Sequence, residues 1–61
     1  MKFEDEKMQS LFDKIRFLRN AVSWNEYRGF IQESDKLHLQ LIQEEQAFVE
    51  YVEQKIEEAK S

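Results

Sequence analysis

The chain has 61 residues, of which 41% are hydrophobic and 36% charged, with one Gly, no Pro and no Cys. A chain this short buries only ~60% of the surface that its unfolded form exposes, so it needs a disulfide, a structural metal or self-association for stability. The lack of Cys excludes disulfides and cysteine-based zinc sites, and a single His leaves little for a metal site. We therefore expect no metal and no cofactor, and a protein that associates with itself.

The charge balance bears on the class of partner. Nine Lys and Arg against 13 Asp and Glu give a net charge of −4, which disfavours binding to nucleic acid by overall charge. The longest apolar run is residues 47–49, far short of the ~20 residues that span a membrane. The N-terminal residues are too acidic for a signal peptide. We expect an acidic small cytoplasmic protein without a membrane partner.

Helix-forming residues dominate the chain, which predicts an all-α fold. The first helix is predicted over about residues 3–21, because apolar residues recur there at steps of three and four. They are Met8, Leu11, Phe12, Ile15, Leu18 and Val22. Phe17 falls nearly opposite this stripe, so we expect it to face solvent or a partner.

A short turn is predicted at residues 20–23, where Ser23 and Glu26 have the spacing of a capping box. The second helix is then predicted over about residues 24–60, with room for a kink at 33–35, because an apolar stripe keeps its phase from Tyr27 to Ala59. Short connections favour antiparallel neighbours. Residues 1–61 are thus expected to form a single helical-hairpin domain with a short first and a long second helix.

In such a hairpin the first helix ends beside Leu41, and the apolar face of residues 42–59 stays uncovered. A lone amphipathic helix gains little stability in water, so a second copy or another protein is expected to cover it. Antiparallel pairing of two second helices, with residue numbers that sum to 83, sets His38 of one copy against Glu45 of the other. The predicted fold is therefore a hairpin that dimerises into a four-helix bundle. Its dimer core consists of Ile31, His38, Leu41, Ile42, Glu45, Val49, Val52 and Ile56.

His38 and Glu45 are the residues most suggestive of chemistry, because both exchange protons and bind cations. No nucleophile, second His or Gly-rich loop accompanies them in the sequence. We therefore predict no catalytic residue and no enzymatic activity, and interpret the two as a buried polar pair that sets the dimer register.

The predicted function is that of a protein-binding regulator, adaptor or inhibitor that acts as a homodimer. Two apolar residues outside the core stripes and three arginines near the turn are candidate partner-binding residues: Phe17, Leu39, Arg16, Arg19 and Arg28. The alternative is a nucleic-acid-binding hairpin dimer that uses the basic region near the turn, with aromatic residues as stacking groups. Net charge disfavours this alternative.

Overall fold

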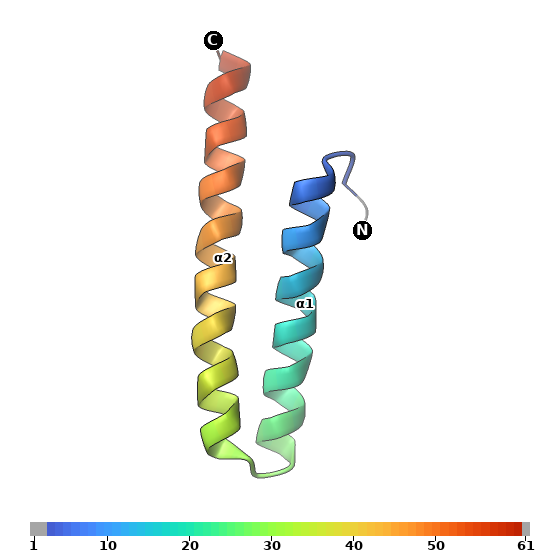
Figure 1. The fold of residues 1–61 in the computed structure, drawn as a ribbon, viewed down its shortest axis with the longest axis vertical. Coiled ribbons are helices and arrows are strands. Elements are labelled where there is room, and N and C mark those ends of the chain that lie inside the picture. Colours follow the sequence, from blue (N-terminus) through green and yellow to red (C-terminus); the bar gives the residue numbers. More distant parts are fainter. Residues whose placement is uncertain (1–2, 61) are drawn as a thin grey trace.

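The computed structural model describes residues 3–60 and contains two α-helices, α1 (Glu6–Tyr27) and α2 (Ile31–Lys60). The helices lie side by side and antiparallel, joined by a short turn, and the end of α2 extends past the start of α1 (Figure 1). The predicted all-α helical hairpin is confirmed. Neither helix combines the length and the apolar character needed to cross a membrane, as far as residues 3–60 are concerned.

The start of α1 is set by Asp5. One oxygen of its carboxylate, Oδ1, accepts hydrogen bonds from the backbone N–H groups of Lys7 at 2.9 Å and Met8 at 3.1 Å, which would otherwise lack partners in the first turn. Phe3 precedes the helix, and its N–H donates to Oε1 of Gln9 at 2.6 Å. The first helix therefore begins at Glu6, three residues after the predicted start.

The end of α1 is set by Gly29, which has a φ of 82°. The N–H of Gly29 donates to the carbonyl of Glu26 at 3.1 Å, and the N–H of Phe30 donates to the carbonyl of Asn25 at 2.8 Å. This pair of bonds is a Schellman motif, which needs a left-handed residue where Gly29 stands. The turn therefore lies at residues 28–30, and its prediction at residues 20–23 is wrong.

The predicted capping box does not form, because Ser23 lies within α1. The Glu26 carboxylate instead accepts a hydrogen bond, at 3.4 Å, from the buried hydroxyl of Ser34 on α2. The second helix begins at Ile31 rather than Trp24, and it passes through residues 33–35 without interruption. The capping-box spacing of Ser23 and Glu26 suggested a helix start at this point, but the chain turns at Gly29 instead.

Because the turn lies at residues 28–30 and not at 20–23, α1 packs against a longer part of α2 than predicted. At the open end of the hairpin, the hydroxyl of Tyr51 donates to Oδ2 of Asp5 at 2.7 Å, so α1 reaches as far as Tyr51. The prediction that the first helix ends beside Leu41 is wrong. Residues 52–60 of α2 extend past the start of α1 (Figure 1). The apolar face predicted to stay uncovered over residues 42–59 is exposed at Ile42, Val49 and Ile56, on the flank of α2 beside α1.

The core between the helices is thin. Among the described residues, only Ile15, Val22 and Leu41 are buried apolar residues, and Ser34 is buried beside them. Near the open end, Phe3, Phe12 and Phe48 form an aromatic cluster, with ring centroids 5.3 to 6.4 Å apart. Two helices share a single interface, so each can bury only one stripe of side chains.

We predict that Gly29→Ala destabilises the hairpin by about 1–2 kcal/mol, the cost of holding an L-residue in the left-handed region. A Cβ at Gly29 would meet no atom within 4 Å, so the loss is conformational and not steric. Gly29→Asn should lose less, because Asn tolerates this region better than Ala. Urea denaturation measures both variants. Equal stability of the Ala variant and the natural chain would contradict a turn at Gly29.

Candidate functional site

Two rows of exposed or half-buried residues run along one flank of α2. Ile42, Val49 and Ile56 form the first row at seven-residue spacing, and their side chains are 45%, 52% and 49% exposed. The second row has the same spacing and consists of Ile31, His38, Glu45 and Val52. Paired rows at this spacing are the pattern by which one helix packs against another in a coiled coil. We call the two rows together the α2 stripe; they consist of Ile31, His38, Ile42, Glu45, Val49, Val52 and Ile56.

Leu41 is the one predicted dimer-core residue that lies elsewhere. Its side chain is 7% exposed and packs in the core of the hairpin. Ile42 follows it by one residue, about 100° further round the helix, so the α2 stripe lies beside the α1 contact and not within it. Leu41 therefore belongs first to the core of its own chain, and the other predicted residues remain accessible to different degrees.

Glu45 has a partner within the chain. Its Oε2 forms an ion pair with the guanidinium of Arg19 at 2.9 Å. This contact turns Arg19 toward α2, so Arg19 does not join the other candidate partner-binding residues. His38 is exposed, and it lies seven residues before Glu45 in the same row. The apposition of His38 and Glu45 across two copies stays a prediction.

A second exposed apolar face lies on α1. Phe17 is 70% exposed and Trp24 is 65% exposed. Each follows a buried residue, Ile15 or Val22, by two positions, which places it about 200° away, on the side opposite α2. The ring of Tyr27 meets the ring of Trp24 edge to face, with centroids 6.1 Å apart. The predicted exposure of Phe17 is confirmed.

Basic residues accompany this face. The guanidinium of Arg16 lies 6.0 Å from the ring centroid of Phe12, and that of Arg28 lies 5.6 Å from the ring centroid of Phe30. Lys14 lines an open hollow that reaches Phe17, and the carboxylates of this hollow come from Glu4, Glu6, Asp13 and Glu44. Neither ion pair found within residues 3–60, Arg19–Glu45 or Lys55–Glu58, involves any of these three cations.

The predicted partner-binding residues thus divide between two opposite sides. Leu39 is exposed, but it precedes the buried Leu41 by two residues and faces outward on α2, away from Phe17. Trp24, Tyr27 and Lys14 were missing from the predicted set. Trp24 can be identified by its seven-residue distance from Phe17, which places the two side chains on the same face of a helix. This holds only if both residues lie in α1, that is, if the turn is assigned to Gly29.

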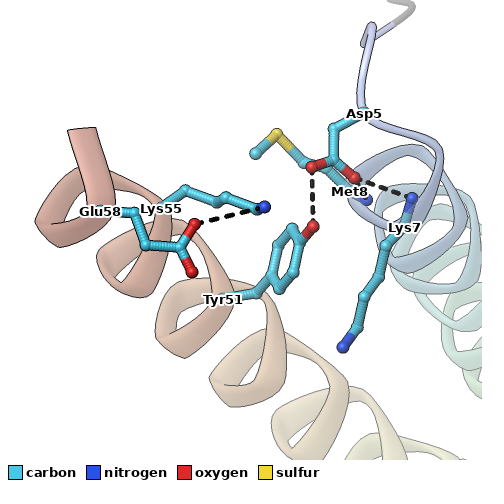
Figure 2. Close-up of polar contacts among 6 residues, drawn as sticks. All are labelled: Asp5, Lys7, Met8, Tyr51, Lys55 and Glu58. Atoms are coloured by element: carbon cyan, nitrogen blue, oxygen red, sulfur yellow. Dashed lines mark hydrogen bonds and ion pairs between the residues drawn. The ribbon is translucent and has the colours of Figure 1, made fainter.

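A polar cluster joins the start of α1 to α2 (Figure 2). The hydrogen bond from Tyr51 is the main reason that the pKa of Asp5 is lowered, and the N–H of Met8 adds to it. The same bond raises the pKa of the Tyr51 hydroxyl. The ammonium groups of Lys7 and Lys55 lie 4.9 and 5.4 Å from the centroid of the Tyr51 ring. A raised pKa leaves even less of the Tyr51 hydroxyl ionised at neutral pH, so the hydroxyl remains a donor to Asp5 and the bond holds the open end of the hairpin together.

Neither the polar cluster nor any other part of residues 3–60 brings three His, Asp or Glu side chains together in a way that could hold a metal ion. Comparison of the chain with protein-family models, with curated proteins and with solved structures finds no match. The candidate functional surfaces of the chain are therefore the two exposed faces, on α1 and on α2.

The Asp5–Tyr51 bond predicts a pH dependence. Because the folded pKa of Asp5 lies below its unfolded value of about 4, the bond contributes stability above that pH and loses it as pH falls through the folded pKa. In Tyr51→Phe, the pKa of Asp5 should rise toward the unfolded value, as measured by NMR titration of its carboxyl carbon. Tyr27→Phe is the matched control and should leave the Asp5 titration unchanged. An unchanged Asp5 titration in Tyr51→Phe would show that the bond does not form in solution.

The Arg19–Glu45 pair should contribute little to stability. Both side chains are substantially exposed, at 65% and 40%, and exposed pairs contribute ~0–1 kcal/mol. A double-mutant cycle with Arg19→Ala and Glu45→Ala should therefore give a small coupling energy, whereas Leu41→Ala should cost about 2–5 kcal/mol. A larger coupling of Glu45 to His38 than to Arg19 would show that Glu45 changes partner when the protein dimerises.

Proposed function

We propose that this chain is a small, non-enzymatic, cytoplasmic regulator, adaptor or inhibitor that binds another protein and acts as a helical homodimer. The observation that carries the proposal is the exposed heptad spacing of Ile42, Val49 and Ile56 on α2. Aliphatic residues repeated in this way gain stability only when a second helix covers them. No reaction is assigned to the chain.

The exposed surface of the chain is large enough to include an interface with a partner. The chain exposes 5199 Å², whereas a compact monomer of its mass exposes about 4200 Å². The surplus of about 1000 Å² is close to the ~800 Å² that each protein contributes to an interface of standard size.

The register proposed for the dimer agrees with the length of the hairpin. When residue numbers in two antiparallel α2 helices sum to 83, residue 32 of one copy faces residue 51 of the other. The segment of α2 that α1 covers in one copy then pairs with the same segment of the other copy. Four helices lie over one common length, and Ile31 faces Val52. Ile56 lies four residues past the end of this pairing, because α2 of the other copy begins at Ile31.

Dimerisation is tested by placing charges on the α2 stripe. The natural chain should sediment at micromolar concentration with about twice its mass of 7.5 kDa. Ile42→Glu combined with Val49→Glu should sediment as a monomer, because both side chains would be buried in the dimer and an unpaired buried charge is costly. Leu39→Glu is the matched control and should remain dimeric, because Leu39 is exposed but lies outside the stripe. A natural chain that sediments as a well-folded monomer contradicts the proposal.

A further inference from the structure

The outer face of α1 has the geometry of a site for one more helix. Phe17, Asn20, Ala21 and Trp24 stand at positions i, i+3, i+4 and i+7, the four corners of the hole that receives a side chain from a packed helix. Ala21 is small and forms the floor of this hole. Phe17 and Trp24 form its two ends, about 10 Å apart along the helix axis. We call these four residues the α1 hole.

The charges that flank the α1 hole have one sign. In a helix pair, the positions beside the apolar seam carry the charges that select the partner. On α1 these positions hold Lys14 and Arg28 on one side and Arg16 on the other, and all three are basic. Asp13 is the nearest carboxylate of the seam itself, and it accepts a hydrogen bond from Gln9 at 2.9 Å.

We infer that the α1 hole binds an amphipathic helix of a partner protein whose apolar residues are flanked by Asp and Glu. Exposed Trp and Phe residues are strong anchors when a partner buries them. The flanking cations favour an acidic partner and disfavour a basic one. The inference rests on the proposed protein-binding function and names the surface and the chemistry of the partner.

The α1 hole stays accessible in the proposed homodimer. It lies on the side of α1 opposite α2, whereas the dimer is built on the flank of α2. The two surfaces therefore do not compete for one occupant. The i, i+3, i+4, i+7 arrangement of the α1 hole fits a side chain of a packed helix rather than the phosphate backbone of a nucleic acid.

The test uses a designed probe and the natural chain of 61 residues. The probe is a blocked three-heptad peptide with Leu at the apolar positions, Glu at the flanking positions and no Trp or Tyr. The control peptide carries Lys in place of each flanking Glu. Trp24 is the only Trp of the chain, so its fluorescence reports directly on the α1 hole. We expect the Glu peptide to shift Trp24 emission to shorter wavelength and to bind at least about tenfold more tightly than the Lys peptide at low salt.

Variants of the chain distinguish an effect of charge on peptide binding from an effect on folding. Lys14→Glu, Arg16→Glu and Arg28→Glu combined should invert the preference, so that the Lys peptide binds more tightly than the Glu peptide. Lys36→Glu is the matched control, because Lys36 is an exposed cation on α2, and it should leave the preference unchanged. Phe17→Ala should weaken binding of the Glu peptide while thermal unfolding stays nearly unchanged.

Four outcomes would overturn the inference. They are equal affinity for the two peptides, no change in Trp24 emission, tighter binding of single-stranded oligothymidine than of the Glu peptide, and a Trp24 emission that shifts when the protein alone is diluted. The last result would mean that a second copy covers the α1 hole. Sedimentation of the same samples keeps the two proposals apart. A dimer that binds no peptide contradicts only this inference, and a monomer that binds the Glu peptide contradicts only the homodimer.

Discussion

A hairpin of two helices has one helix–helix interface, and the rest of this structure depends on that limit. Each helix buries a single stripe, so the buried apolar residues within 3–60 are Ile15, Val22 and Leu41. The other large apolar side chains lie on flanks and outer faces, where one neighbouring helix cannot reach them. The small core and the exposed apolar side chains therefore have the same cause, and both favour association with other helices.

The register of the hairpin is fixed by polar contacts at its two ends. At the closed end, the Schellman bonds around Gly29 stop α1 and set where α2 begins. At the open end, the Asp5 carboxylate caps α1 and also accepts the hydroxyl of Tyr51 (Figure 2). Between these ends the apolar stripes pack, and Arg19 meets Glu45. A change of turn position would alter every one of these cross-helix contacts.

The two exposed faces suit different partners because they differ in charge and position. The α2 stripe contains aliphatic residues in heptad spacing with His38 and Glu45 among them, which suits a second copy. The α1 hole has aromatic ends and basic flanks on the opposite helix, which suits an acidic helix. In the proposed dimer each copy presents its own α1 hole, so one assembly offers two equivalent sites. Two linked sites bind a repeated or dimeric partner more tightly than either site alone.

The sequence by itself determined the local features: helical content, two amphipathic stripes, an antiparallel hairpin and the exposure of Phe17. These follow from residue propensities and the 3.6-residue period, which act over a few neighbours. The turn depended on a choice between two local signals, Ser23 with Glu26 and Gly29, and only the folded chain shows that α1 continues to the glycine. The partners of Glu45 and Tyr51, the burial of Leu41 and the placement of Trp24 opposite α2 all depend on that choice. They were decided by the tertiary structure, because contacts between residues 26 or 46 positions apart exist only after the register is set.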